Sequence, residues 1–428
     1  MGGPGAGPPS LSDPVNPSQA PAAASRMTAA ERRASASLAA VFAARMLGLF
    51  LVLPVFALEA ARYPGGTDPA LIGLAMGIYG LTQGVLQIPY GLASDRFGRK
   101  RVIVLGLLVF AAGSLLGAWA PTLHWLVAAR ALQGAGAISA AVTALLADQT
   151  RDVVRTKAMA MVGASIGLMF AVSLVAAPAA AAHIGLSGLF AVTGLLAVLC
   201  MAAVGWWTPP EPQLHADVPR GRVADVLALP ALVRLNVGVF VLHAVQLAMW
   251  VALPSLLVQA GLAKADHWKI YLPAVLASFV VMGFTLFPLE RRGYLRAVFL
   301  VSIGLVGLVQ LGLALMAPHA GLPALAVLLF LFFCGFNVLE ATQPSLASRL
   351  APAQARGTAM GIYNTLQSLG LFAGGVVGGW LAKHVGVAGL FAACAAMMVL
   401  WLVVAWPMRA PGRPASAEEV LAEEAQAT

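Results

Sequence analysis

Long apolar runs separated by short polar connections make up most of the chain. Each run is close to the roughly 20 residues that an α-helix needs to cross the hydrocarbon core of a bilayer. Six runs come first, a longer polar connection follows, and six more runs come after it. The pattern predicts an all-α membrane protein with twelve transmembrane helices in two six-helix bundles. The predicted spans lie near residues 36–58, 70–92, 102–120, 123–147, 158–182, 186–207, 232–258, 270–289, 297–317, 323–349, 357–382 and 387–408.

The polar segments around these runs define the predicted domain organisation. Residues 1–35 begin with a stretch rich in Pro, Ala, Gly and Ser that has no apolar core, so we expect a disordered tail and not a signal peptide. The two predicted bundles are 36–207 and 232–408. Between them, 208–231 is a linker with several prolines and mixed charges, and 409–428 is a polar tail that ends in glutamates.

Composition indicates that lipid, and not water, surrounds most of the protein. The chain is 60% hydrophobic and 10% charged, with a mean hydropathy of +0.86, whereas a soluble protein has roughly 25% charged residues. The net charge of +9 could indicate nucleic acid, but the bases are spread over short loops and no separate basic domain is present. We therefore expect a lipid bilayer as the partner of the apolar surface, and no nucleic acid.

Chemistry-bearing motifs are sparse. Cys200, Cys334 and Cys394 each lie inside an apolar run and have no CxxC spacing, which argues against disulfides and metal ligation. The chain lacks the GxSxG, HExxH and P-loop patterns that a membrane-embedded enzyme of those classes would need. We expect no enzyme activity, no metal site and no cofactor other than a proton gradient.

The basic residues fall mainly on one side of the predicted topology. With both termini in the cytoplasm, the cytoplasmic loops and tails hold 20 of the 26 Lys and Arg residues, and Arg45 and Arg130 lie within spans. This asymmetry predicts that both termini are cytoplasmic. The opposite loops hold the remaining four: Arg62, Lys264, Lys269 and Lys383.

Corresponding loops in the two halves are alike. The basic loop 91–101 follows the second span, and the charged segment 290–296 follows the eighth. The segment 155–159 (RTKAM) follows the fourth span, and 356–360 (RGTAM) follows the tenth. Two halves related by an axis along the membrane normal are typical of transporters whose substrate site lies between the halves, near the midplane.

Two motifs resemble those of the major facilitator superfamily. The loop 91–101 (GLASDRFGRKR) is similar to its GxLaDrxGrkx motif and departs at the third position. The segment 130–136 (RALQGAG) on the fourth span is similar to its RxxQGxG motif. The resemblance covers nearly all of the membrane region and implies alternating access of a small-molecule substrate between two halves.

Three further segments, 45–50, 77–83 and 357–363, resemble the bacterial YajR branch of this superfamily, whose members are regarded as proton-driven efflux transporters. We expect the soluble C-terminal domain of that branch to be absent, because only a short acidic tail follows the last span. In the drug-antiporter motif the fifth span would be glycine-rich around a proline, whereas Pro178 lies among alanines. That departure leaves the direction of transport open.

The resemblance assigns a conformational role to the basic loop. It implies that Asp95 docks at the N-terminus of the eleventh span, around 357–359, where the helix dipole favours an anion. This contact, which we call the latch, would hold the two halves together on the inner side. The alternative is a loop carboxylate that only balances four bases. The predicted latch residues are Gly91, Asp95, Arg96, Gly98, Arg99 and Lys100.

Three ionisable residues inside spans are candidates for proton coupling. A charge such as Arg130 within a span costs about 2.5–3.5 kcal/mol on insertion scales, so it must face the interior or snorkel to the interface. Arg45 raises the same question from the cytoplasmic side. Glu340 is the single acid deep inside a span, and it could bind and release a proton or form a structural hydrogen bond.

Polar side chains at helical spacing predict a substrate cavity. Tyr79, Gln83 and Gln87 share one face of the second span. Such groups need partners inside a membrane, and a water-filled cavity or interhelical hydrogen bonds would supply them. The mixed aromatic and amide character favours an amphipathic or lipophilic organic substrate. The other candidates are Gln133, His243, Gln246, Trp250, Asn337, Asn364 and Gln367.

Together these observations predict a secondary active transporter of the bacterial inner membrane that works as a monomer. We expect proton-coupled efflux of small amphipathic organic compounds. A proton symporter or facilitator for uptake of a metabolite such as a sugar or an organic acid is the alternative. A non-transporting membrane receptor or scaffold is a more remote one.

Overall fold

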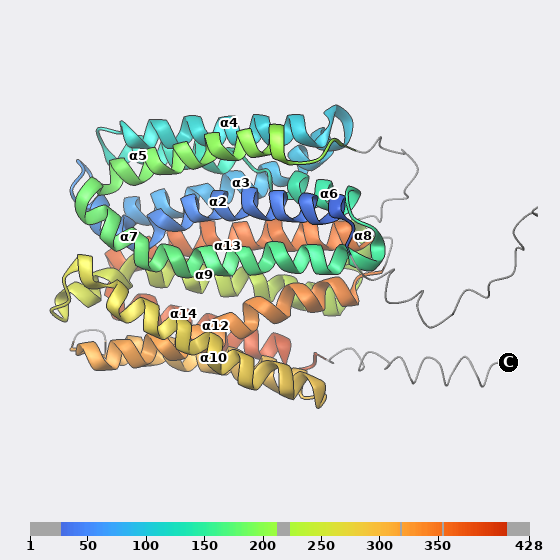
Figure 1. The fold of residues 1–428 in the computed structure, drawn as a ribbon. Coiled ribbons are helices and arrows are strands. Elements are labelled where there is room, and N and C mark those ends of the chain that lie inside the picture. The colour runs from blue at the N-terminus through green and yellow to red at the C-terminus, as the bar shows by residue number, and fades with distance from the viewer. Residues whose placement is uncertain (1–26, 212–222, 317–318, 353–354, 409–428) are drawn as a thin grey trace, which may run out of the picture.

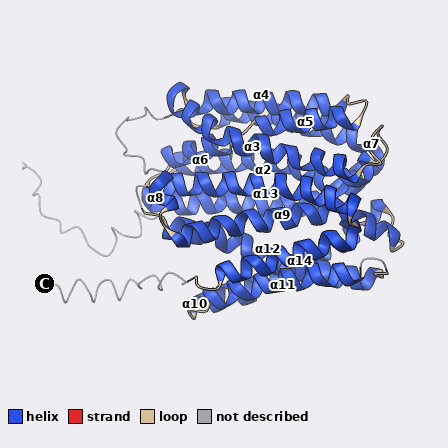
Figure 2. Cartoon of the chain, turned by 180° about the vertical axis from the view of Figure 1, so that it is seen from behind, coloured by secondary structure: helices blue, strands red, loops and turns tan. Residues whose placement is uncertain are grey.

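The computed structural model describes residues 27–211, 223–316, 319–352 and 355–408. These ranges are helical and contain no strand, which confirms the predicted all-α membrane fold (Figure 2). Among the described residues, eleven helical segments are long and apolar enough to cross a membrane, with Leu123–Asp148 counted as one segment. Most of the predicted N-terminal tail, part of the linker and the predicted C-terminal tail lie outside the described residues.

The helices lie side by side along one common direction (Figure 1). Their bounds are α2 Ala29–Ala60, α3 Pro69–Phe97, α4 Arg99–Ala118, α5 Leu123–Ala135, α6 Ser139–Asp148, α7 Asp152–Ala202, α8 Val223–Leu227, α9 Pro230–Gln259, α10 Trp268–Arg291, α11 Leu295–Met316, α12 Leu322–Leu350, α13 Arg356–His384 and α14 Gly386–Ala405, with a π-turn η1 at Ala203–Trp207 and a 3-10 turn η2 at Lys264–Asp266.

The 51-residue α7 contains both the fifth and the sixth predicted spans, because the chain reverses within it. Gly185 has a φ of 64°, a conformation that an L residue with a side chain adopts rarely. On either side of it, Ser165 donates to the Ala39 carbonyl at 3.4 Å and Cys200 to the Val41 carbonyl at 3.4 Å. Two residues so far apart in α7 reach the same turn of α2 only if α7 folds back on itself.

The fourth predicted span, 123–147, is one continuous apolar run in the sequence, but in the structure its helix is broken into α5 and α6. Helix α5 ends before Gly136, whose backbone turns away from the helix at φ −78° and ψ 51°. A side chain at this glycine would lie 2.4 Å from the Gly106 carbonyl and 2.9 Å from the Phe110 Cβ. At the break the Gly136 carbonyl accepts from the Ile138 N–H at 2.9 Å and from the Arg45 guanidinium at 3.3 Å.

The two halves meet mainly where α3 packs against α13, and α13 also packs against α9. Glycines allow the helix backbones to touch: a Cβ on Gly73 would lie 2.1 Å from the Gly375 carbonyl, and one on Gly80 would lie 2.3 Å from the Ser368 carbonyl. Close approach of this kind stabilises the interface by van der Waals packing along a stripe of small residues.

We call the helix ends that carry Arg99, Arg151, Arg296 and Arg349 the basic face, and the ends that carry Glu59, Asp68, Lys264 and Lys383 the opposite face. The α3–α13 contact is tight near the opposite face and loosens toward the basic face. A Cβ on Gly84 would lie 3.3 Å from the Thr365 carbonyl, whereas one on Gly361 or Gly357 would meet nothing within 4 Å. The halves therefore separate toward the basic face.

Candidate functional site

Arg45 lies at the centre of a polar cluster inside the N-terminal half. Its side chain is 1% exposed. Its guanidinium donates to the Tyr79 hydroxyl at 2.9 Å, to Ser139 Oγ at 3.3 Å and to Gln83 Oε1 at 3.5 Å, in addition to the Gly136 carbonyl described above. A guanidinium has five N–H donors in a fixed fork, so it can hold α2, α3 and the broken fourth span together.

Arg130 on α5 extends the same cluster from the other side of Tyr79. Its guanidinium carbon lies 4.7 Å from the centre of the Tyr79 ring, and it donates to Gln133 Oε1 at 2.9 Å. Gln133 in turn donates to Ser114 Oγ at 2.8 Å. Arg130 is 1% exposed, which places it in the bundle interior and not at the interface. Two arginines thus share one tyrosine, through its hydroxyl and its ring face.

This cluster carries fixed positive charge. Within the described part of the chain, neither Arg45 nor Arg130 forms an ion pair with a carboxylate, and neutral oxygens and π faces are their partners. Desolvation disfavours a buried cation without a counter-ion, so these two charges depend on the hydrogen bonds of the terminal guanidinium nitrogens and on the ring contacts. The Nε atoms of both arginines have no partner within the described residues.

Glu340 and His243 form the corresponding cluster in the C-terminal half. His243 Nε2 on α9 lies 3.3 Å from Glu340 Oε2 on α12. Gln367 on α13 contacts both groups, with its Nε2 at 2.7 Å from His243 Nε2 and 3.4 Å from Glu340 Oε1. His243 Nδ1 lies 2.8 Å from the Val239 carbonyl, so Nδ1 carries a hydrogen and Nε2 faces the carboxyl. Three helices therefore converge on one titratable pair.

The remaining predicted cavity residues lie in different surroundings. Asn337 donates to Ser278 Oγ at 2.8 Å, and Trp250 packs edge-on against Tyr271 at 5.3 Å between ring centres. Both pairs are contacts within the C-terminal half. Gln87 is buried and its amide has no partner within the described residues, while Gln246 and Asn364 are half-buried. The role of these five residues as cavity lining stays a prediction.

The basic loop between α3 and α4 is held by a compact charge network. Arg99 forms an ion pair with Asp95 on the preceding helix, donates to Ser94 Oγ at 2.7 Å and pairs with Asp148 of α6 at 3.0 Å. Gly98 makes the turn with a φ of 98°. The docking of Asp95 at the start of α13 stays a prediction, and the space around Gly357 there is open.

Two ion pairs join the halves at the opposite face, and the sequence alone did not indicate them. Glu59 at the end of α2 pairs with Lys264 in η2, and Asp68 before α3 pairs with Lys383 at the end of α13 at 2.8 Å. The ammonium of Lys383 holds the pKa of Asp68 below its usual value. Both pairs lie where the α3–α13 contact is tightest, so they reinforce closure of this face.

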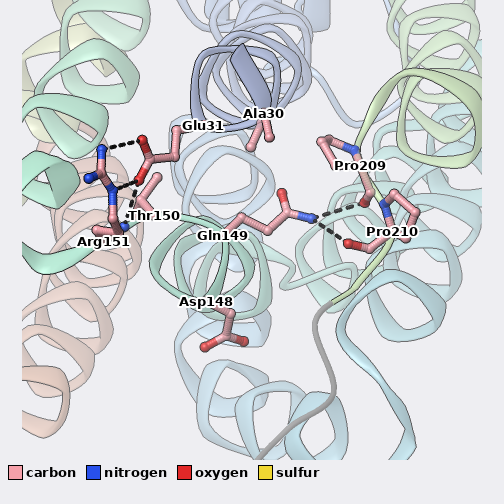
Figure 3. A pocket seen from close by; sticks show the side chains of 9 residues that line it. Ala30, Glu31, Asp148, Gln149, Thr150, Arg151, Pro209 and Pro210 are labelled. Atoms are coloured by element: carbon pink, nitrogen blue, oxygen red, sulfur yellow. Dashed lines mark hydrogen bonds and ion pairs between the residues drawn. The ribbon is translucent and has the colours of Figure 1, made fainter. Parts of the chain in front are cut away.

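A cavity of about 370 Å³ lies at the basic face of the N-terminal half (Figure 3). On one side Glu31 of α2 accepts from Arg151 Nε at 2.8 Å, and on the other the Gln149 amide donates to the Pro209 carbonyl at 2.9 Å. These contacts tie the start of α2 and the start of the linker to the α6–α7 connection. The cavity lies apart from the Arg45 and Glu340 clusters, so we assign it a structural role.

A helical bundle of two halves, glycine-packed at their interface and containing polar clusters in each half, is the architecture of a membrane transporter. The family model of the Major Facilitator Superfamily matches residues 38–375 and 288–427. The chain belongs to this superfamily, so it is a membrane transporter of small molecules and not an enzyme.

Relatives place it more closely within the superfamily. The chain is 43% identical to the inner membrane transport protein YajR of Escherichia coli over 392 residues, which cover 90% of this chain and 85% of that protein. This confirms the resemblance to the YajR branch. It is 28% identical to the multidrug resistance protein MdtH of Aeromonas salmonicida over 356 residues, 80% of this chain and 86% of that one.

The fold matches solved structures of the superfamily at low sequence identity. One is a bacterial homologue of the human lysosomal transporter Spinster, with a TM-score of 0.70 and 13% identity over 89% of this chain and 97% of that chain. This likeness concerns the fold alone.

Proposed function

We propose that this protein is a proton-coupled exporter of small amphipathic organic compounds in a bacterial inner membrane, with both termini in the cytoplasm. The basic face is then cytoplasmic, as expected when positive loops stay inside. Support for the membrane comes from the 43% identity to YajR, and support for export comes from the similarity to MdtH proteins. The observation that carries the proposal is the contact between Glu340 and His243.

A carboxyl beside an imidazole can share one proton, and this is the chemistry that coupling requires. With the proton present, either an imidazolium faces a carboxylate or a carboxylic acid donates to Nε2, and both draw α9 and α12 together. Without the proton, the Nε2 lone pair and the carboxylate repel each other. The Gln367 amide then bridges them, and its two observed contacts fit this deprotonated arrangement.

The bridge links the proton to the helix that opens and closes. Gln367 is on α13, whose glycines pack against α3 of the other half. Tyr363, one turn before it, is buried, and its hydroxyl has no hydrogen-bond partner within the described residues. Protonation therefore changes the hydrogen bonds of α13 at the interface around which residues 36–207 would rock against 232–408. In the described arrangement the halves separate toward the basic face, which is the inward-facing state of such a cycle.

The fixed charge of Arg45 and Arg130 would complement this site in the other half. An arginine side chain is a permanent cation in proteins, so the N-terminal half contributes constant positive charge while the Glu340–His243 pair gains and loses a proton. Loading and release of the proton then change the electrostatic attraction between the halves. The role of the arginines in this proposal is to set the field in which the proton site works.

Proteoliposomes that enclose a pH-sensitive dye test the proposal. Purified protein is reconstituted, and tetraphenylphosphonium, a hydrophobic dye cation, glucose and lactate are added one at a time while substrate and proton fluxes are followed. Proton movement opposite to substrate supports export by antiport. Movement in the same direction indicates symport, and substrate flux without protons indicates a facilitator; either result overturns the proposal.

Two variants locate the proton site. Glu340→Gln keeps the shape of the side chain and removes its proton exchange, so we expect substrate flux that no longer responds to a pH gradient. Glu290→Gln, at a half-exposed ion pair with Arg349 on the same half, is the matched control and should behave as wild type. Equal pH dependence in both variants would exclude Glu340 from coupling.

A further inference from the structure

Helix α4 begins with a charge pattern that opposes its own dipole. Its first three residues are Arg99, Lys100 and Arg101, and its first turn contains no acid. The N-terminal end of a helix carries partial positive charge and four unpaired N–H groups, so cations there are unfavourable. The residue at the cap position is Gly98, which has no side chain to accept a hydrogen bond.

The missing cap comes from a residue far away in the sequence. Glu211 Oε2 accepts from the Arg99 backbone N–H at 3.0 Å, and Glu211 Oε1 accepts from the Lys100 backbone N–H at 2.6 Å. One carboxylate thus binds two of the free N–H groups and brings negative charge to the basic turn. A Cβ at Gly98 would lie 3.3 Å from Glu211 Oε2, a close contact with a flexible side chain, and the φ of 98° is the stronger reason for a glycine at this position.

The residues before Glu211 are held to the same half. Lys100 Nζ donates to the Thr208 carbonyl at 2.7 Å, and the Gln149 amide donates to the carbonyls of Pro209 and Pro210 at 2.9 and 3.2 Å. The chain is therefore bound to the N-terminal half from the end of η1 up to Glu211, where the described part of this segment ends. These bonds hold the first residues of the linker, 208–211, to the N-terminal half.

We propose that Glu211 is a positioning residue of the basic loop. By holding the Arg99 backbone, it keeps the Arg99 guanidinium between Asp95 and Asp148 and keeps Asp95 oriented for the latch. It also ties residues 208–211 at the start of the linker to that loop, so the loop and this segment move together when the halves rock. This inference rests on the proposed alternating-access cycle and its latch, and it adds an acid outside the 91–101 motif to the machinery.

Spin-label distances in the full-length protein in lipid test this inference. Cysteines replace Trp206 and Tyr294, which are exposed at the basic ends of the two halves, and the distance distribution reports whether the basic face is open or closed. We compare Glu211→Ala, Glu211→Gln and Glu211→Asp with Asp95→Asn. The control is Asp266→Asn, which removes a half-exposed ion pair with Lys269 within one half.

We expect Glu211→Ala to shift the open-to-closed ratio about tenfold toward the open basic face, a change of about 1.4 kcal/mol. Transport should lose turnover while KM changes little, because Glu211 does not touch the polar clusters. Glu211→Gln keeps one acceptor oxygen and loses the charge, so its open-to-closed ratio should lie between those of the wild type and Glu211→Ala. Glu211→Asp keeps the carboxylate and should restore most of the wild-type ratio. A cap that is only structural would lower thermal stability and leave both the ratio and the split between turnover and KM unchanged.

The comparison with Asp95→Asn separates the role of Glu211 from that of the latch, and the proteoliposome flux assay tests the proposed function independently of both. If Asp95→Asn shifts the distances and Glu211→Ala does not, the latch stands and the role of Glu211 is overturned. If neither variant shifts them, the latch itself fails and the role of Glu211 fails with it. If Glu211→Ala does not fold, Glu211→Gln alone decides, and a wild-type ratio in that variant overturns the proposal.

Discussion

Glu59 of α2 and Lys264 of η2 form an ion pair that joins the two halves at the opposite face. The Glu59 side chain is only 2% exposed, and the same carboxylate contacts Arg62 at 3.4 Å within its own half. Within the described residues, the other ion pair between the halves, Asp68 with Lys383, also lies at this face. Closure of the opposite face is therefore electrostatic as well as steric.

Glu59→Gln should open the opposite face. The substitution leaves a partly buried ammonium without its counter-charge, which typically costs about 1–3 kcal/mol. In a rocking cycle the halves touch through this pair only while the opposite face is closed. The loss should therefore appear as a roughly tenfold change in the ratio of molecules closed at the opposite face to molecules open there. Distances between spin labels at Trp119 and Val385, both exposed near this face, measure it. Arg62→Gln is the matched control, because Arg62 is 69% exposed and does not cross the interface; an equal effect in that variant would show that the Glu59–Lys264 pair does not hold the opposite face closed.

Gly375→Ala should weaken the α3–α13 contact. The added Cβ would lie 2.5 Å from the Gly73 carbonyl and 2.7 Å from Gly77, both backbone atoms that cannot move independently of α3. We expect a loss of about 1–3 kcal/mol in thermal unfolding and a shift away from the state that is closed at the opposite face. Gly361→Ala on the same helix meets nothing within 4 Å and should be neutral or slightly stabilising. Equal melting temperatures for the two variants would exclude close glycine packing.

Arg45→Lys should destabilise the N-terminal half although it keeps the charge. An ammonium is a point donor and cannot reach the Tyr79 hydroxyl, Ser139 and the Gly136 carbonyl together, as the guanidinium does. We expect about 1–3 kcal/mol lower stability, measured by thermal unfolding in detergent. Arg62→Lys, at an exposed position, should change it by less than about 0.5 kcal/mol. Wild-type stability in Arg45→Lys would mean that charge alone is needed at this site.

Asp68→Asn should reduce the loss of stability on acidification. Lys383 lowers the pKa of Asp68 in the folded protein, so the pair stabilises the fold at pH values above the ordinary aspartate pKa of about 3.9. That contribution disappears as the pH falls through the lowered pKa. Asparagine still caps α3, where Asp68 accepts from the Ala70 N–H at 2.9 Å, and it is as good a cap as aspartate.

The measurement is the melting temperature between pH 7 and pH 3 for wild type and Asp68→Asn. The two curves should differ at pH 7 and converge at low pH, because the wild type loses its ion pair there. Parallel curves over the whole range would show that the pair does not contribute to stability.

Motifs and charges in the sequence predicted some residues of the polar clusters but not the contacts between them. Arg45, Arg130 and Glu340 could be found because a charge inside an apolar span is conspicuous, and the structure places all three beside other predicted polar residues. Their exact partners could not be found. The only sign in the sequence of the break at Gly136, which provides a carbonyl for Arg45, is a pair of closely spaced glycines. Glu340 and His243 are nearly 100 residues apart in the sequence, so no local pattern indicates that they are partners.

The sequence by itself determined the class of protein, the order of the helices and the presence of two similar halves. These follow from local quantities: the length of each apolar run against the thickness of a bilayer, and the identity of short motifs in loops. Tertiary structure decided which backbone touches which, that Glu211 caps α4, and that Glu59 and Asp68 reach across to the other half. Such pairings depend on how helices distant in the chain align in space, and every apolar span has several faces on which its few polar groups could have found a partner.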